Sequence, residues 1–204
     1  MKNIIYPILC ALLLASCNAK DENVEVPLSL PESAILDDQA ISDESIFNLT
    51  SDWNTEEGEK MKLEELKGKV LVMVMIYTTC KAACPRLVAD MHSIAQQVPK
   101  KYQDEIQYVL VSIDPVNDTP GKLKSFALRN KMDTDEWTFL QGNENTVQEF
   151  ANVLSVKYKE ISPEDFSHSN IISVFNRQGE LIHQQEGLGV DNKETIEKII
   201  ATVK

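Results

Sequence analysis

Two cysteines, four residues apart, offer the most specific chemistry in this 204-residue chain. Cys80 and Cys84 follow the apolar run 70–77, and Pro85 comes directly after the second cysteine. The run is rich in β-branched residues and predicts a strand covered on both faces, and the residues after Pro85 switch to helical spacing. A strand, a thiol pair and a helix in this order predict a reactive or metal-binding site in an α/β fold.

The helix that follows the cysteines should influence their ionisation. The N-terminus of a helix stabilises a nearby thiolate, so we expect at least one of the two thiols to be ionisable near neutral pH. Two other interpretations are open: both cysteines pack as small hydrophobic residues, or they form a structural disulfide. The polar neighbours Thr78, Thr79 and Lys81 favour a functional pair over a packed one.

A metal site needs a third ligand, and the chain has three histidines. His92 and His183 fall inside a predicted helix and a predicted strand, where a structural role is the ordinary interpretation. His168 is expected in a loop just before the strand that begins at Ile171. Two thiolates and one imidazole form a soft site suited to Cu(I), which can also bind Cu(II). Zinc would normally take a fourth ligand or a water molecule.

The first residues have the pattern of a secretory signal. Lys2 precedes the apolar stretch 4–14, which is too short for a permanent membrane span and ends in small residues directly before Cys17. This arrangement resembles the lipobox of bacterial lipoproteins and predicts that residues 1–16 are removed and that Cys17 is lipidated. The alternative is an ordinary signal peptide, cleaved nearby, that leaves Cys17 free. Either way, the chain is expected on the extracytoplasmic side of the bacterial cell envelope, with Cys17 as its membrane anchor in the first case.

Composition divides the rest of the chain into a tether and one domain. Residues 17–44 contain scattered acidic residues and two prolines but no aromatic residue, which predicts an acidic flexible tether. Residues 45–204 are long enough for one domain with its own core. The formal net charge of −12 would repel phosphate backbones, so no nucleic acid partner is expected.

Hydrophobic periodicity predicts the elements that position the cysteines and the histidine. The order is that of a thioredoxin-like α/β domain with additions, in which helices flank a central mixed sheet. The predicted elements after the central strand are helix 87–98, strand 106–113, helix 120–130, strand 137–140, helix 147–154, strands 171–175 and 180–185, and helix 195–203. A turn with Gly179 at a position that needs positive φ joins the last two strands. Before the central strand, 46–49 is predicted as a short strand and 61–66 as a short strand or helical turn.

Three segments together resemble the Sco/SenC family in motif, order and spacing. They are YTTCKAACP at 77–85, VSIDPVNDTP at 111–120, and His168-Ser169 ahead of the turn at Gly179. The resemblance extends from about Ile46 to the C-terminus. It implies a membrane-tethered thioredoxin-like protein that receives copper from a donor protein. It also implies assembly of the dinuclear copper centre of cytochrome c oxidase, with the oxidase subunit that carries this centre as a partner.

Carried over by position, the resemblance makes Cys80, Cys84 and His168 the copper ligands. Asp114 and Pro115 match the second motif but are expected to shape the adjacent loop and not to bind metal. The chain departs from the family at two places. Lys81-Ala82-Ala83 stands where members commonly have a proline and often an acidic residue, and Ser167 stands where an aspartate often precedes the histidine. Lys81 would favour thiolate, whereas Ser167 would leave His168 less firmly oriented.

These observations favour a copper carrier that passes its ion on by ligand exchange. The main alternative is a thiol-disulfide oxidoreductase that reduces partner cysteines in the cell envelope. Cys80 and Cys84 are separated by three residues, whereas the ordinary redox motif has two, and Tyr77 stands where a thiol peroxidase has threonine. A third alternative is a tethered adaptor without metal or redox chemistry. His168 separates the first two, because a reductase has no evident need for it.

Overall fold

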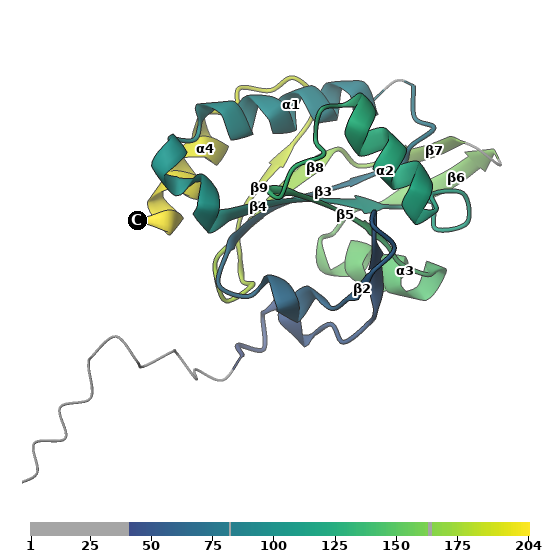
Figure 1. Cartoon of the computed structure of the whole chain (residues 1–204), viewed down its shortest axis with the longest axis horizontal. Coiled ribbons are helices and arrows are strands. Elements are labelled where there is room, and N and C mark those ends of the chain that lie inside the picture. The colour runs from purple at the N-terminus through teal and green to yellow at the C-terminus, as the bar shows by residue number, and fades with distance from the viewer. Residues whose placement is uncertain (1–40, 82, 163–164) are drawn as a thin grey trace, which may run out of the picture. The chain divides into compact units, whose positions relative to one another are not determined.

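A seven-stranded mixed sheet forms the centre of the computed structural model, which describes residues 41–81, 83–162 and 165–204 (Figure 1). The strand order is β2-β1-β5-β4-β3-β8-β9. β3, β4 and β5 run parallel, and the remaining pairs in this sheet are antiparallel. The strands are β1 (Trp53–Thr55), β2 (Lys60–Met61), β3 (Val70–Ile76), β4 (Ile106–Ser112), β5 (Trp137–Gln141), β8 (Ile171–Phe175) and β9 (Leu181–Glu186).

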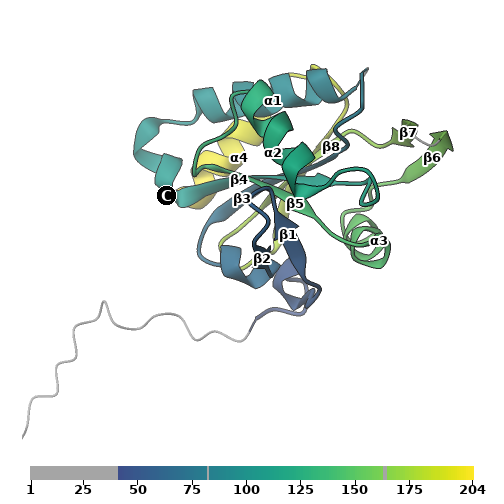
Figure 2. The same ribbon diagram turned by 45° about the vertical axis from the view of Figure 1, so that its right-hand side comes forward.

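Helices cover both faces of this sheet. α1, α2 and α4 lie on one side and α3 lies on the other, in both views of the ribbon (Figures 1 and 2). Their bounds are α1 (Cys84–Gln97), α2 (Pro120–Arg129), α3 (Glu144–Val153) and α4 (Lys193–Val203), and the 3-10 helices are η2 (Ile46–Asn48), η3 (Leu63–Leu66) and η4 (Lys100–Glu105). The predicted α/β, thioredoxin-like architecture with a central mixed sheet flanked by helices is confirmed.

The central strands are buried because both of their faces are covered. All seven residues of β3 and all seven of β4 are buried, which explains the continuous apolar sequence of β3 and the mainly apolar sequence of β4. The buried hydrophobic residues extend from Ile46 to Val203 within one compact unit, Ala40–Lys204. Ile41, in the segment predicted as tether, also packs against this core. Since this unit contains its own core, we expect residues 40–204 to fold alone.

The structure differs from the prediction at the start of the domain. Ile46–Asn48 forms a 3-10 helix and not a strand. The Ser45 hydroxyl accepts a hydrogen bond from the Phe47 backbone N–H at 3.1 Å and thereby caps the turn. Ile46 and Phe47 are both buried. In a strand with only one buried face, successive side chains point to opposite faces, so two consecutive residues would not both be buried. The interval 61–66 contains the end of β2 and the 3-10 helix η3, so it combines the two predicted possibilities.

A separate two-stranded hairpin carries the histidine of interest. It consists of β6 (Tyr158–Ser162) and β7 (Asp165–His168), and it projects away from the main sheet (Figures 1 and 2). The prediction that His168 lies in a loop is therefore wrong, because it is the last residue of β7. Most residues of this hairpin are exposed, so the sequence contains no hydrophobic pattern that reveals it.

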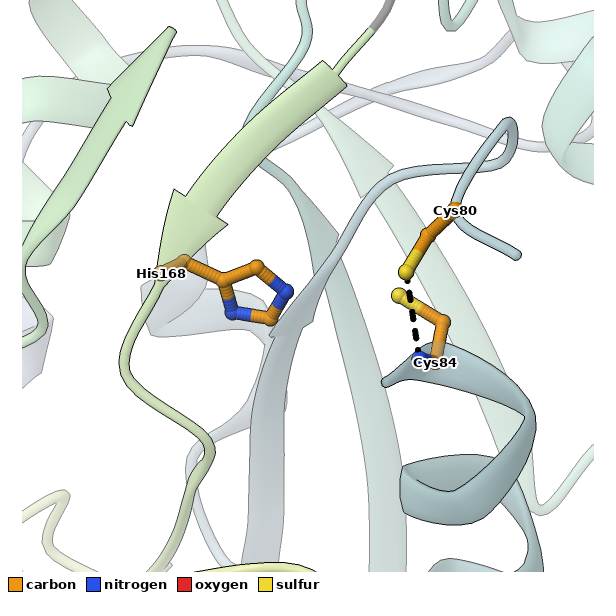
Figure 3. Close-up of side chains that lie close together, drawn as sticks. All are labelled: Cys80, Cys84 and His168. Carbon is orange, nitrogen blue, oxygen red and sulfur yellow. Dashed lines mark hydrogen bonds between the residues drawn. The ribbon is translucent and has the colours of Figure 1, made fainter. Parts of the chain in front are cut away.

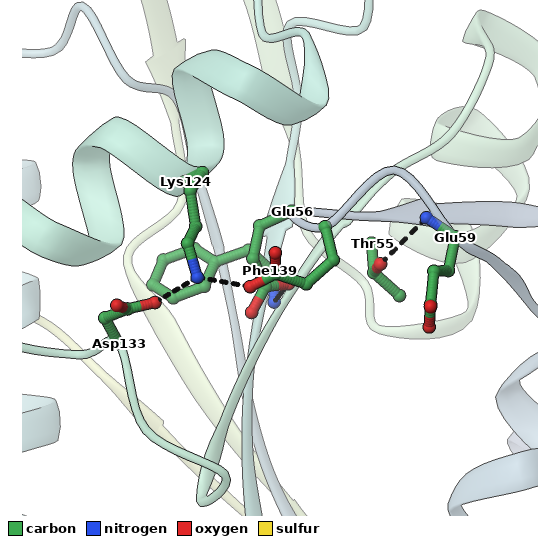
Figure 4. A network of polar contacts seen from close by, with 7 residues as sticks. Thr55, Glu56, Glu59, Lys124, Asp133 and Phe139 are labelled. Atoms are coloured by element: carbon green, nitrogen blue, oxygen red, sulfur yellow. Dashed lines mark hydrogen bonds and ion pairs between the residues drawn. The ribbon is translucent and has the colours of Figure 1, made fainter.

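Polar contacts secure the turn between β1 and β2 (Figure 4). Glu56 follows the short strand β1, and its carboxylate accepts a hydrogen bond from the Phe139 backbone N–H of β5 at 2.9 Å. Since β1 ends at Thr55, the Glu56 carboxylate supplies the β5 backbone with the acceptor that a longer β1 would have provided. Burial raises the pKa of this carboxyl. Lys124 of α2 forms ion pairs with Glu57 and Asp133 and ties the same turn to the helix.

The signal and lipid-anchor predictions concern residues outside the described part of the chain. Residues 1–16, Cys17 and most of the 17–44 tether belong to this group, and these assignments stay predictions. Within the described residues, no helix has the length and apolar character that a membrane crossing requires.

Candidate metal centre

Cys80 and Cys84 meet where β3 gives way to α1. Cys80 lies in the turn after the strand, and Cys84 is the first residue of the helix. Neither cysteine is in a disulfide. The backbone N–H of Cys84 donates to the Cys80 Sγ at 3.2 Å (Figure 3). Because Ala83 at the N-cap offers no side-chain acceptor, the sulfur of Cys80 takes the place of a capping oxygen. The predicted placement of a thiol at the helix N-terminus is thus confirmed for Cys80.

Cys84 has the opposite electrostatic environment from the one expected. It is only 1% exposed, and burial raises the pKa of its thiol well above the usual range. A hydrogen bond from the Tyr77 backbone lowers the pKa of Cys84, but the adjacent Cys80 and the nearby Asp118 raise it further. Cys84 is therefore not the ionisable thiol that the sequence predicts, and the expectation that at least one of the two thiols ionises near neutral pH stays a prediction for Cys80. The Cys84 thiol is protonated at neutral pH, and a metal ion must displace that proton in order to bind the sulfur.

His168 faces the cysteines from the hairpin (Figure 3). Its Nδ1 lies 3.0 Å from the Ser169 carbonyl oxygen. A carbonyl only accepts hydrogen bonds, so Nδ1 carries the proton and Nε2 has a free lone pair. Nε2 is buried and has no hydrogen-bond partner among the described residues. Burial lowers the pKa of the ring, which keeps it neutral at neutral pH. A buried lone pair aimed at two thiols is the state that a metal ligand requires.

The three predicted ligands come together in space. The candidate ligand atoms of Cys80, Cys84 and His168 all lie within 4.8 Å of one another, and they form the one such cluster found in the described part of the chain. Metal bonds to nitrogen and sulfur are about 2.0–2.3 Å long, so two ligand atoms on one ion are separated by no more than about 4.6 Å. A small contraction of the cluster brings all three atoms onto one ion.

The other two histidines have structural contacts, as predicted. His92 Nε2 lies 2.7 Å from the Asn130 carbonyl oxygen, and its ring packs on Trp137. His183 Nε2 lies 3.0 Å from the Thr195 hydroxyl. Neither belongs to the cluster.

The second motif shapes the loop beside the cysteines. Asp114 is buried and accepts hydrogen bonds from the backbone and side chain of Asn117, at 3.2 and 3.0 Å, so it closes a local turn and is not part of the metal cluster. Asp118 is fully buried and accepts from the Thr78 backbone N–H at 3.0 Å and from the Ser112 hydroxyl at 2.7 Å. It thereby holds the residues that lead into Cys80.

Two contributors to this site were not identified from sequence. Asp118 stands in a recognisable motif, but its buried hydrogen bonds to Thr78 become visible only when the strand ends are placed side by side. Tyr77 follows β3, and its hydroxyl donates to Asp165 of β7 at 2.7 Å. These two residues are 88 positions apart, and no local pattern links them.

A cavity of about 750 Å³ lies beside the hairpin. Its walls come from the loop after β4, the first turns of α3, and the hairpin itself, including Phe166 of β7. Val116 on that loop is 72% exposed. The hairpin that carries His168 therefore forms one wall of a recess.

Comparisons with known proteins agree with this geometry. The SCO1/SenC family model matches residues 42–204. The SCO1 protein homolog of Bacillus subtilis (strain 168) is 33% identical over 100 residues, which cover 48% of this chain and 51% of the relative. The matched segment thus spans about half the length of that protein.

Solved structures share the fold. A SCO1/SenC family lipoprotein from Bacillus anthracis str. Ames has a TM-score of 0.68 at 22% identity, with 75% of this chain and 92% of that chain covered. Bradyrhizobium japonicum ScoI with copper bound has a TM-score of 0.64 at 20% identity, with coverages of 74% and 96%. With a family model that matches nearly the whole described part of the chain, and with the cysteine pair and distant histidine assembled in one place, this protein belongs to the SCO1/SenC family.

Proposed function

We propose that this protein is a copper carrier that holds one copper ion between Cys80, Cys84 and His168. The observation that carries this proposal is the buried Nε2 of His168, which has no hydrogen-bond partner among the described residues and faces the sulfurs of Cys80 and Cys84 within 4.8 Å. Two sulfurs and one imidazole form a soft donor set that suits Cu(I) and leaves out the fourth ligand that zinc prefers. The structural similarity to a ScoI protein with copper bound supports this choice of metal.

Copper is the cargo of this site, and the three ligands differ in how accessible they are. Cys80 is half-buried and lies in the turn, whereas Cys84 is buried at the start of α1. A thiol or imidazole of a partner protein can therefore displace the outer ligand first, and the remaining ligands follow one at a time. In this exchange the ion is never released into water. The cavity beside the hairpin offers room for a segment of the partner.

The recipient in this proposal is the subunit of cytochrome c oxidase that carries its copper centre, and a separate donor protein loads the site. The family resemblance supports this part of the proposal. Lipidation of Cys17 would anchor the protein to a membrane of the bacterial cell envelope, with the domain on the extracytoplasmic side. The similarity to a family member described as a lipoprotein supports the anchor. A Cys17→Ser variant should then leave the membrane fraction, and its retention there would contradict the anchor.

A second function is favoured by one specific contact. Cys80 and Cys84 are not joined by a disulfide, and the Cys84 N–H donates to the Cys80 sulfur, so the two sulfurs are neighbours that could exchange electrons with a partner disulfide. In this alternative the protein is a thiol-disulfide oxidoreductase. His168 then has no evident role.

Two assays on the reduced domain, residues 40–204, separate these functions. This segment contains no cysteines other than Cys80 and Cys84. The carrier predicts close to one bound copper per domain and little reduction of a model disulfide substrate. The oxidoreductase predicts rapid reduction of that substrate without stoichiometric copper binding, and this result would overturn the carrier proposal.

A further inference from the structure

The β6–β7 hairpin that carries His168 needs contacts outside itself in order to hold a fixed position. A two-stranded sheet is marginally stable alone, and this one is not hydrogen-bonded to the main sheet. Along β6 only Tyr158 is even partly buried. The hairpin therefore cannot fix the imidazole opposite the cysteines unless another part of the domain anchors β7.

Tyr77 makes that connection. Its ring packs edge-on against Phe166, with centroids 5.2 Å apart, and against His168, with centroids 5.8 Å apart. Its hydroxyl donates to the Asp165 carboxylate at 2.7 Å and accepts from the Phe166 backbone N–H at 3.3 Å. One buried side chain thus contacts three of the four residues of β7.

The same residue also contacts both cysteines. The backbone carbonyl of Tyr77 accepts from the Cys80 N–H at 3.3 Å, and its own backbone forms a hydrogen bond with Cys84. Tyr77 stands directly after β3, whose residues are all buried in the core, so its position is well defined. The cysteine pair and the histidine are therefore both positioned by contacts with Tyr77.

Ser167 cannot orient the imidazole in the same way. It pairs with Lys159, whereas Phe166 and His168 pair with Glu160 and Tyr158, so Ser167 occupies the alternate face of β7. The carboxylate that anchors this strand is Asp165, at its other end. Its partner is the phenol of Tyr77 and not the histidine.

We infer that the Tyr77 hydroxyl, through its hydrogen bond to Asp165, is a positioning group that sets His168 against Cys80 and Cys84 for copper binding. Tyr77 is not one of the three ligands. Its side chain also interacts with the Cys80 side chain, but its hydrogen bond to Asp165 and its ring contact with His168 assign its effect to the histidine. The copper part of this inference rests on the proposed function, whereas the anchoring of the hairpin does not.

Hydrogen exchange of the metal-free domain tests the anchoring. Tyr77→Phe keeps the ring but removes the hydroxyl. It should speed exchange at hairpin amides such as Ser169, which donates to the Lys157 carbonyl, by about 10-fold or more, as expected for the loss of a hydrogen bond to a charged group. Amides of β3 and β4 should not change. Unchanged exchange in the hairpin would overturn the inference.

Tyr108→Phe is the matched control. Tyr108 is also fully buried, but its hydroxyl has no hydrogen-bond partner among the described residues. The control should leave both hairpin exchange and copper affinity as in the wild type. An equal effect of both variants would show that Tyr77→Phe acts by general destabilisation, which would contradict the inference.

Copper affinity, measured by competition with a chromophoric Cu(I) chelator, tests the link to His168. Tyr77→Phe should weaken binding by about 10- to 100-fold while the stoichiometry stays at one, since groups that orient a metal ligand have effects of this size. Asp165→Ala should match it, and Asp165→Asn, which keeps an acceptor oxygen, should recover most of the affinity. In a His168→Ala background, Tyr77→Phe should have no further effect.

The two hypotheses fail in different ways. A wild-type domain that binds no copper would sink the proposed function, and hydrogen exchange would still decide the anchoring. A domain that binds copper through His168 but is indifferent to Tyr77→Phe would overturn the inference alone. A further loss on Tyr77→Phe in the His168→Ala background would show that the hydroxyl acts through the cysteines and would also overturn it.

Discussion

Asp118 is a fully buried carboxylate without an ion-pair partner among the described residues, and its removal should destabilise the domain. Its oxygens accept hydrogen bonds from the Thr78 N–H, the Thr78 hydroxyl and the Ser112 hydroxyl. These contacts join the end of β3 to the loop before α2. In Asp118→Ala all three donors lose their acceptor.

The loss of stability in Asp118→Ala depends on which of the three donors can form another hydrogen bond. Thr78 is partly exposed, so its hydroxyl can turn to water, but the Thr78 N–H and the buried Ser112 hydroxyl are left without an acceptor. Each unsatisfied buried donor costs about 1–3 kcal/mol, and relief from burying a charge offsets part of this. We expect Asp118→Ala to lower the free energy of unfolding by about 2–4 kcal/mol.

Asp118→Asn should cost much less, about 1 kcal/mol. The Thr78 N–H and the Ser112 hydroxyl share one carboxylate oxygen, Oδ2, so an amide oxygen in that place can accept from both. The amide nitrogen then faces the Thr78 hydroxyl oxygen, which can accept from it.

The difference between Asp118→Asn and wild type should also depend on pH. Burial raises the pKa of Asp118, so the folded state holds the proton at pH values where the unfolded chain has lost it. The contribution of this group to stability is therefore present at low pH and declines as the pH rises through the folded-state pKa. Asparagine does not titrate, so its contribution to stability does not decline. The free energy of unfolding of Asp118→Asn should therefore rise relative to that of the wild type as the pH rises from acidic to neutral.

Urea unfolding of the reduced, metal-free domain at neutral pH measures these values. For a domain of this size, 1 kcal/mol corresponds to a shift in Tm of about 2–4 °C. Asp104→Ala is the control, because that aspartate is exposed, and it should stay within about 0.5 kcal/mol of the wild type. A loss in Asp118→Ala no larger than the control, or equal losses in the alanine and asparagine variants, would refute the reasoning.

Two further predictions concern the fold and the metal site. Gly179→Ala should destabilise the domain by about 2–5 kcal/mol, because φ is +78° and a Cβ would lie 2.7 Å from the Ser45 Oγ and 2.8 Å from the Phe47 ring. Gly58→Ala, at φ +83° with no atom within 4 Å, should cost only about 1–2 kcal/mol in the same urea-unfolding assay, and equal costs would contradict the steric argument. Copper affinity should rise from mildly acidic to mildly alkaline pH, because burial keeps the Cys84 thiol protonated and each bound ion must displace that proton. Chelator competition across this range, with proton release followed by calorimetry, checks it; a pH-independent affinity would show that Cys84 is not a ligand.

The strand, cysteine pair and helix were predictable because their signals are local. β3 is covered on both faces and α1 begins beside Pro85, so the apolar run and the change to helical spacing appear directly in the sequence. The position of His168 within its element was not predictable, since β6 and β7 are mostly exposed and have no hydrophobic periodicity. The raised pKa of Cys84 depends on burial by elements distant in sequence, and the Tyr77–Asp165 bond depends on a contact across 88 positions.

The central claim is that His168 completes a copper site with the two cysteines, and the copper affinity of His168→Ala tests it most directly. The reduced domain, residues 40–204, is titrated in competition with a Cu(I) chelator beside His183→Gln, a control at a histidine that contacts Thr195 and lies outside the cluster. We predict one copper per wild-type domain, an affinity at least about 10-fold weaker in His168→Ala, and no change in His183→Gln. Equal affinities in the wild type and His168→Ala would contradict the assignment of the third ligand.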